Sequence, residues 1–489
     1  MQPEPSFQPH EPLPNVNEQF QLGLKHIQQG DFASARWVAE AIRAAAPQVP
    51  LTFVLLANIH AAEGDPDAGL AQVQAGLDVQ GDAPLLLEAG ARLSVLRSAA
   101  EDALDFVERI PEDAAVWRRS RVWRERALVQ LGRLDEAASN LESLDPRMPP
   151  ETILLAQIRE QQGDADAARS QLTSLLDTPG LKKRFEARAA FELSRLCDAL
   201  GEHDAAFAAA TRGNQRIARG FNAAGWTTQA DGIVSNWSEE LMASAPRSEC
   251  VGSEPIFIIG LPESGRTLVE QVIGQHPEVV ALGEYPGIRT ALETTFQQID
   301  GGMAPEQLTE QAITRTANDV GALLETSDAA GSRMVCRPQG IEHLAGLLPL
   351  CVPSCRVVFV RRAPLDNLLS IYLRFYRSMT LPYSTGLDEL VTARQCHDRL
   401  VDHWMQVLPC PCLDVSTEAL IADPEGQVGA LLEFLDLSWD AGCLAPLGEQ
   451  ASDGADSEQE SSAVSALQEG RWRNYEAHIG PLLSAFGSA

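Results

Sequence analysis

Apolar residues recur at helical spacing through residues 17–245, with polar and charged residues between them. This spacing predicts a series of amphipathic helices. Self-similar turn sequences interrupt the pattern, and they read GDFASA, GDPDAG, SAAEDA, GRLDEA, GDADAA and GEHDAA from residues 30, 64, 98, 132, 163 and 201. Their starts differ by 34, 34, 34, 31 and 38 residues, which indicates a repeat of two helices joined by a turn.

The residue five places after each turn start is always small, which suits two helices that pack closely. These residues are Ala35, Gly69, Ala103, Ala137, Ala168 and Ala206. With its period of 34 the segment resembles tetratricopeptide repeats, although an ordinary helical bundle is an alternative. We therefore predict a helical solenoid over 17–245 whose concave groove binds a protein or peptide. The acidic, Pro-rich residues 1–16 are predicted to form a disordered tail.

The pattern changes after residues 244–255, where Pro, Ser and Gly cluster. Residues 255–260 form a short apolar run, 261–265 a glycine-punctuated turn, and 266–277 return to helical spacing. A strand, a loop and a helix in this order point backbone N–H groups at an anion near a helix N-terminus. Residues Gly260 to Thr267 match the motif G-x-x-x-x-G-R-T, which is a phosphate-loop pattern with Arg in the place of Lys.

Two blocks, residues 255–287 and 355–376, resemble sulfotransferases, in particular the bacterial branch with N-terminal tetratricopeptide repeats that is related to protein-tyrosine sulfotransferases. The resemblance implies a three-layer, phosphate-loop-like α/β domain with a parallel sheet over 254–489. It also implies the co-substrate 3′-phosphoadenosine 5′-phosphosulfate and no metal. By the same correspondence Arg362 and Ser370 contact the 3′-phosphate, with Arg471 as a further contact. The remaining predicted nucleotide contacts lie in the loop, at Ser264, Gly265, Arg266 and Thr267.

The resemblance places a catalytic base at Glu284, although an acid there could also cap the next segment. Around it the sequence departs from the family. Glu263 stands where an Arg is usual, and we hypothesise that Arg266 supplies the displaced cation while Glu263 turns to solvent or pairs with Arg266. The family's catalytic Lys is replaced by Cys336, and Arg337 is the nearest cation. Because side chains alternate in an extended chain, Arg337 could face the wrong way.

The composition limits the classes of partner that this chain is expected to bind. The formal net charge is −30, and only three of the 38 basic residues are lysines, none after Lys183. Such a chain suits neither nucleic acid nor an anionic membrane surface. The N-terminus has no signal-peptide pattern, so we expect a cytoplasmic protein. Nine scattered cysteines without a C-x-x-C pair are expected to be buried, reduced thiols. The acidic, Ser-rich residues 449–468 are predicted to form a flexible loop.

Three functions are compatible with these patterns. The leading one is a sulfotransferase that transfers a sulfuryl group from 3′-phosphoadenosine 5′-phosphosulfate to a hydroxyl acceptor, with a protein tyrosine as one candidate. The alternative is a catalytically degenerate sulfotransferase-fold protein that acts as a repeat-based protein-binding scaffold. A nucleoside-triphosphate kinase is third, because the apolar run 355–360 ends in two arginines and not in an acidic magnesium ligand.

Overall fold

The computed structural model describes residues 15–29, 32–62, 65–218, 220–249, 254–324, 332–376, 381–448, 467 and 469–487. Two compact units divide the chain, Met1–Arg133 and Leu134–Ala489. The domain boundary predicted between residues 245 and 254 differs from this division and stays a prediction. The predicted tail and acidic loop lie almost wholly outside the described residues. Within the described ranges no helix has the length and apolar character that crossing a bilayer requires.

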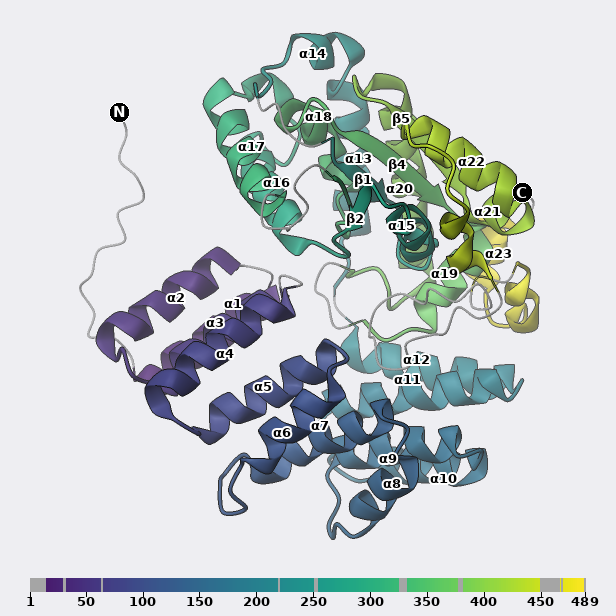
Figure 1. Cartoon of the computed structure of the whole chain (residues 1–489). Coiled ribbons are helices and arrows are strands. Elements are labelled where there is room, and N and C mark those ends of the chain that lie inside the picture. The colour runs from purple at the N-terminus through teal and green to yellow at the C-terminus, as the bar shows by residue number, and fades with distance from the viewer. Residues whose placement is uncertain are drawn as a thin grey trace. The chain divides into compact units, whose positions relative to one another are not determined.

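The first unit consists of antiparallel helical hairpins (Figure 1). Its helices are α1 (Val16–Gln29), α2 (Phe32–Ala45), α3 (Pro50–Ala62), α4 (Pro66–Gln80), α5 (Pro84–Leu96), α6 (Ala100–Glu108) and α7 (Trp117–Gln130). The second unit begins with helices of the same kind, α8 (Leu134–Glu142), α9 (Pro149–Gln161), α10 (Ala165–Leu176), α11 (Lys183–Ala199) and α12 (His203–Ile217), followed by α13 (Ala223–Asn236) and α14 (Glu239–Ser244).

The predicted turns fall between the two helices of a hairpin wherever the structure describes them. Gly132, Gly163 and Gly201 end helices with φ of 73°, 85° and 75°, values that glycine adopts without steric cost. Ser98 occupies the equivalent place with φ 58°, so this turn keeps its conformation without a glycine. The first two turn glycines lie outside the described residues.

The predicted small positions are buried in both units. At Gly69 an added Cβ would lie 3.0 Å from the carbonyl oxygen of Ala57 and 3.1 Å from Leu93. A larger side chain would therefore push neighbouring helices apart. The period of small residues thus records helix-to-helix contact, and the helical-repeat prediction is confirmed.

The rest of the second unit surrounds a five-stranded parallel sheet of order β2-β3-β1-β4-β5. The strands are β1 (Ile256–Ile259), β2 (Val279–Ala281), β3 (Arg333–Cys336), β4 (Arg356–Arg361) and β5 (Cys412–Ser416). The helices are α15 (Arg266–Gly274), α16 (Pro286–Gln298), η1 (Pro305–Gln307), α17 (Glu310–Leu324), η2 (Glu342–Leu347), α18 (Leu348–Cys351), α19 (Pro364–Tyr372), α20 (Leu387–Val407), α21 (Thr417–Ala422), α22 (Pro424–Phe434), η3 (Ala441–Leu447), η5 (Arg471–Tyr475) and α23 (Gly480–Phe486).

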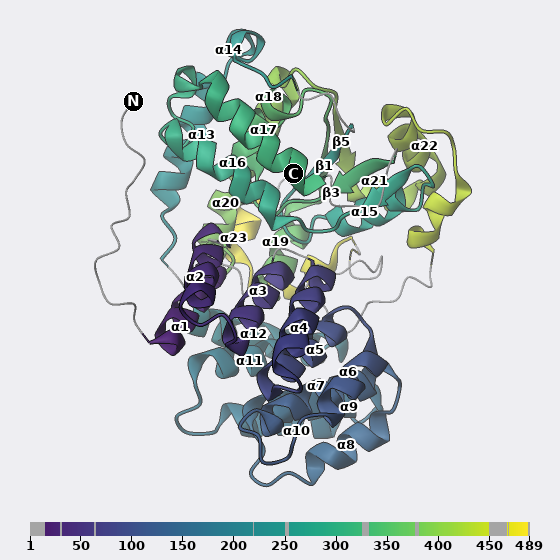
Figure 2. The ribbon, with the colours of Figure 1, turned by 60° about the vertical axis from the view of Figure 1, so that its left-hand side comes forward.

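Helices cover both faces of this sheet (Figure 2). Alternate residues of β1 point to opposite sides. Phe257 and Ile259 join the core formed with α13, α16, α17 and α20, whereas Ile256 and Ile258 join the core formed with α15 and α22. Strands buried on both faces are typical of parallel sheets. The predicted three-layer α/β arrangement is confirmed.

A third core joins the last helical hairpin to the elements beside the sheet. Phe207 of α12 stacks on Tyr372 of α19 and on His478, with ring centroids 5.0 and 4.8 Å apart. The same core contains Phe191 of α11 and Leu482 of α23. The hairpin α11–α12 therefore packs directly against α19, which carries the predicted Ser370.

Candidate functional site

The carboxyl ends of the parallel strands bring the predicted site residues to one edge of the sheet. The loop after β1 carries Ser264, the segment after β2 carries Glu284, and Arg337 follows β3 directly. Arg362 follows β4 in the same way. Ligand sites of open α/β sheets lie at this edge, so the topology assembles residues that are distant in sequence.

At two positions of the loop after β1, only glycine fits, because a side chain would collide with neighbouring atoms. A Cβ at Gly260 would lie 2.5 Å from the carbonyl oxygen of Val360, and one at Gly265 would lie 2.6 Å from Oγ1 of Thr417. Gly265 also has φ 93° and directly precedes α15. The N-terminal N–H groups of α15 have no partner within the helix and face the loop side, where they favour an anion.

Inside this loop the side chains are buried. Ser264 is 1% exposed, and its hydroxyl oxygen has no hydrogen-bond partner in the described part of the chain. Leaving a buried hydroxyl unpaired costs free energy, so the site fits a ligand with acceptor oxygens, such as a phosphate. Thr267, at the second position of α15, is 8% exposed.

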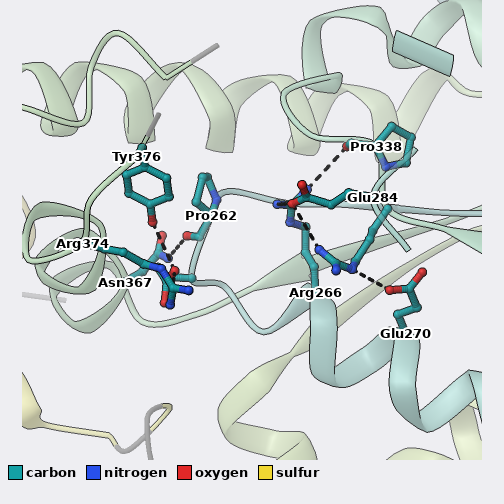
Figure 3. Close-up of polar contacts among 10 residues, drawn as sticks. Pro262, Arg266, Glu270, Glu284, Pro338, Asn367, Arg374 and Tyr376 are labelled. Carbon is teal, nitrogen blue, oxygen red and sulfur yellow. Dashed lines mark hydrogen bonds and ion pairs between the residues drawn. The ribbon is translucent and has the colours of Figure 1, made fainter. Parts of the chain in front are cut away.

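Glu263 is buried at 6% exposure and has φ 59°, so the expectation that it turns to solvent is wrong. Its carboxylate lies 3.3 Å from Nη1 of Arg374 and accepts a hydrogen bond of 3.2 Å from the hydroxyl of Tyr376 (Figure 3). Both partners follow α19. The repulsion expected between this acid and an anionic ligand is therefore offset by a nearby guanidinium.

Arg266 and Arg337 both lie close to the carboxylate of Glu284; Arg266 and Glu284 are labelled in Figure 3. Nη1 of Arg337 lies 3.2 Å and Nη2 of Arg266 4.0 Å from Oε1 of Glu284. Both arginines are buried, whereas the Glu284 side chain is 28% exposed. Cys336 is buried in the core, whereas the next residue, Arg337, faces the site. The carboxylate and two cations form one cluster at the open end of the sheet.

Glu270 holds this cluster in place and was not among the predicted residues. Its Oε2 lies 2.5 Å from Nε of Arg337, and its Oε1 accepts a 2.8 Å hydrogen bond from the backbone N–H of Gly283. Burial raises the pKa of Glu270, and the charge of Arg337 opposes that shift. Glu270 follows Arg266 by four residues, so both lie on one face of α15. That spacing was a usable sequence signal.

Arg362 and Ser370, the two predicted contacts of the 3′-phosphate, lie side by side, and their contact with a phosphate stays a prediction. Nη1 of Arg362 donates to Oγ of Ser370 at 3.3 Å and to the carbonyl oxygen of Glu263 at 3.0 Å. Arg362 is 2% exposed, which rules out the surface ion pair that would be the ordinary explanation of such an arginine. Burial lowers the pKa of Arg362, and the positive charge of Arg471 acts in the same direction.

Two further side chains support the loop and could not be identified from local patterns. Asn367 donates through Nδ2 to the carbonyl oxygen of Pro262 at 2.7 Å (Figure 3), and Thr417 donates through Oγ1 to that of Ser264 at 2.5 Å. Asn367 lies in α19, and Thr417 opens α21 directly after β5. Their partners are more than one hundred residues away, beyond the reach of sequence spacing.

A cavity of about 250 Å³ lies between α13, α16 and α20. Its walls combine apolar side chains, among them Trp226, Phe296 and Leu400, with a similar number of polar and charged ones, among them Glu293 and Glu342. His397, 3% exposed, also lines it, and burial lowers its pKa well below the usual range. Arg289 of α16 lines the cavity one turn into the helix that follows Glu284. The size is below the range of about 300–1,000 Å³ for drug-sized ligands.

No group of three or more His, Cys, Asp or Glu side chains within the described ranges is arranged to hold a metal ion. The eight cysteines described there are unbridged, and all but Cys412 are buried.

Known proteins that are similar to this chain include sulfotransferases. Residues 255–441 match the model of the sulfotransferase family. An uncharacterised protein of Aquifex aeolicus is 23% identical over 373 residues, which are 73% of this chain and 48% of that protein. Protein-tyrosine sulfotransferase A of Caenorhabditis elegans is 28% identical over 201 residues, which are 38% of this chain and 50% of that protein.

A solved sulfotransferase domain from the curacin biosynthetic pathway has 15% identity and a TM-score of 0.31, and the match covers 47% of this chain and 98% of that one. The chain spans about half the length of the two relatives described above. Residues 255–441 are similar to the sulfotransferase family, and a series of helical hairpins precedes them in this chain.

Proposed function

We propose that this protein transfers a sulfuryl group from 3′-phosphoadenosine 5′-phosphosulfate to a hydroxyl acceptor. The observation that carries the proposal is the convergence of a buried, glycine-shaped loop, an Arg362–Ser370 pair and a carboxylate on one sheet edge. The match of residues 255–441 to the sulfotransferase family adds the reaction class. Together they favour a nucleotide with phosphates at both ends of its ribose.

In this proposal the loop holds the 5′-phosphosulfate. The N-terminal N–H groups of α15, the hydroxyls of Ser264 and Thr267, and Arg266 supply donors. Arg362, Ser370 and Arg471 hold the 3′-phosphate. Since no lysine follows residue 183, arginines carry all of this charge recognition, and their planar forks suit phosphate oxygens.

The reaction is an in-line displacement at sulfur. The acceptor oxygen forms a bond to sulfur while the bond from sulfur to the bridging phosphate oxygen breaks. Glu284 takes the acceptor proton, and the electron pair of the broken bond stays on the departing 3′-phosphoadenosine 5′-phosphate. Arg337, held by Glu270 beside Glu284, is the residue we assign to stabilise the growing negative charge in place of the missing lysine.

The cavity between α13, α16 and α20 is the candidate acceptor site. Its volume of about 250 Å³ and its walls of mixed apolar and polar side chains suit one small hydroxylated group, and a tyrosine side chain is one such group. The protein that presents it would bind in the repeat groove, as the repeats suggest. A cytoplasmic location stays a prediction from the sequence.

The alternative is a nucleotide-binding or protein-binding scaffold without turnover. Two departures favour it, namely Cys336 in the place of the catalytic lysine and Glu263 in the loop. The contacts of Arg337 with Glu284 and of Arg374 with Glu263 weigh against it, because each restores a cation near the departure.

Calorimetry on the full chain tests the proposal. We expect 3′-phosphoadenosine 5′-phosphate to bind and ATP with magnesium not to bind. Transfer of labelled sulfate to an acceptor should follow when the phosphosulfate and a phenolic or peptide hydroxyl are supplied. Binding without transfer to any acceptor tested would favour the scaffold, and binding of magnesium–ATP in preference would favour a kinase.

A further inference from the structure

An acid of the helical repeats reaches the nucleotide side of the sulfotransferase domain. Oδ2 of Asp198, at the end of α11, lies 2.5 Å from Nη2 of Arg471. The other carboxylate oxygen accepts a hydrogen bond from the hydroxyl of Tyr475. His203 lies 3.5 Å from the same oxygen, and its ring packs edge-on against Tyr475 with centroids 5.1 Å apart. Asp198 therefore sits in a built polar cluster, and neither it nor Arg471 is fully exposed.

Arg471 is also tied to α19 through its own backbone turn. The carboxylate of Asp366 accepts hydrogen bonds from the N–H of Gly470 at 2.6 Å and of Trp472 at 2.9 Å. These two bonds flank Arg471 and fix the turn that carries it. Asp366 lies in α19, the helix that also carries Ser370, so this turn is attached to an element of the proposed 3′-phosphate site. The turn places Arg471, and Asp198 determines where its side chain points.

Arginine can serve two anions at once. Its guanidinium carries five N–H donors in a fixed plane, and the contact with Asp198 uses those at Nη2. A phosphate would be bound through the donors at Nε and Nη1. An arginine side chain that is not held loses rotamer entropy when it is ordered, so an arginine ordered in advance binds a phosphate with a smaller entropic penalty.

We propose that Asp198 is a positioning residue that orders Arg471 for the 3′-phosphate of the nucleotide. The inference rests on the proposed function, since it needs a nucleotide with that phosphate. It makes the hairpin α11–α12 a part of the nucleotide site. A partner that shifts this hairpin would then change the affinity for the nucleotide, and would do so only through the 3′-phosphate.

The test compares two nucleotides on the full chain by calorimetry. The first is 3′-phosphoadenosine 5′-phosphate, and the second is adenosine 5′-phosphosulfate, which lacks the 3′-phosphate. We expect Asp198→Ala to weaken the first about tenfold and to leave the second within twofold, because only the first uses Arg471. Asp198→Asn, whose amide oxygen can still accept from Arg471, should lie between Asp198→Ala and the unaltered chain.

A double-substitution cycle identifies the route. Arg471→Ala should cause at least the loss that Asp198→Ala causes, and the double variant should lose no more than Arg471→Ala alone, because Asp198 acts only through Arg471. The matched control is Asp204→Ala on the same hairpin, which removes a 2.6 Å contact with His478 and should leave both affinities unchanged.

Three outcomes would overturn the role of Asp198. The first is that Asp198→Ala weakens the binding of both nucleotides equally. The second is that Asp198→Ala binds the 3′-phosphorylated nucleotide more tightly than the unaltered chain does. The third is that the losses of affinity add up in the double variant. Failure of the unaltered chain to bind either nucleotide would reject the proposed function itself, and the inference with it. If the unaltered chain bound 3′-phosphoadenosine 5′-phosphate more tightly than adenosine 5′-phosphosulfate, and Asp198→Ala changed neither affinity, only the inference about Asp198 would be rejected.

Discussion

At the scale of single residues, the site compensates for two unfavourable sequence positions. Glu263 would repel an anion, but Arg374 lies 3.3 Å from it. Cys336 occupies the position at which the sequence resemblance expects a lysine, and the next residue, Arg337, contacts both Glu270 and Glu284. In both cases the compensating cation comes from outside the phosphate loop, so the loop sequence alone is a poor guide to its charge.

Glu284→Gln tests the assigned base. Glutamine keeps the size of the side chain but cannot take a proton, so turnover should fall about 10²–10⁴-fold, while the affinity for 3′-phosphoadenosine 5′-phosphate stays within about twofold. Labelled-sulfate transfer and calorimetry measure the two quantities. Glu278→Gln, an exposed acid before β2, is the matched control and should change neither. Undiminished turnover in Glu284→Gln would show that another group is the base.

Ser264→Ala should separate binding from stability. The hydroxyl of Ser264 has no partner in the described residues, so its removal should leave the free energy of unfolding unchanged or raise it. Nucleotide affinity should fall about tenfold, because a donor to the phosphate is lost. Urea denaturation and calorimetry measure the two effects.

The contrasting variant is Thr417→Ala, which removes a hydrogen bond that the free protein does make. It should lower the free energy of unfolding by about 1–3 kcal/mol, since the carbonyl of Ser264 loses its donor. If Ser264→Ala destabilised the protein as much as Thr417→Ala, the hydroxyl of Ser264 would have a structural partner and the argument for a ligand there would fail.

At the scale of elements, the start of α15 depends on glycine for two separate reasons. Gly265 has a left-handed φ of 93°, and a Cβ there would meet Thr417 at 2.6 Å. Gly163, in a repeat turn, has a similar φ of 85° but no atom within 4 Å of an added Cβ. Both positions therefore have a left-handed backbone, but only at Gly265 would an added Cβ meet a neighbouring side chain.

Gly265→Ala should cost more stability than Gly163→Ala. The control should lose about 1–2 kcal/mol from the left-handed backbone alone. Gly265→Ala should lose more than that amount, because the added Cβ also meets Thr417, and it should weaken nucleotide binding because the loop must shift away from Thr417. Thermal unfolding and calorimetry give both readings. Equal stability losses with unchanged affinity would mean that the loop has room that the structure does not show.

At the scale of the whole molecule, the last repeat hairpin shares a core with the sulfotransferase domain. Phe191 and Phe207 pack with Tyr372, Tyr475 and Leu482. Burying one large apolar side chain contributes about 1.5–3 kcal/mol. The hairpin therefore contributes to the stability of the elements that carry the nucleotide site, in addition to whatever it binds.

A pair of truncations tests this dependence. A fragment of residues 134–489 should unfold cooperatively, because it keeps the shared core. A fragment of residues 254–489 lacks α11 and α12, so it should expose apolar surface, bind a hydrophobic dye and lose its near-ultraviolet circular dichroism. Native-like folding of the shorter fragment would show that the shared core is dispensable.

Much of the architecture could be predicted from local patterns. The 34-residue period predicted the helical hairpins because each turn and each small contact residue leaves a mark at a fixed spacing. The run from Pro255 to Pro277 predicted a strand, a loop and a helix for the same reason, since hydrophobic periodicity changes where the backbone changes. These features depend on neighbours within a few residues, and one chain records them directly.

The contacts that complete the site were decided by the tertiary structure. The direction of Arg337 depends on how β3 lies between β2 and β1, and the sequence left both directions open. Asp198 and Arg471 are 273 residues apart, and no spacing rule connects them. Side-chain contacts between distant segments follow from the packing of whole elements, so the sequence determined which residues could bind a nucleotide, and only the fold decided which acids hold them in place.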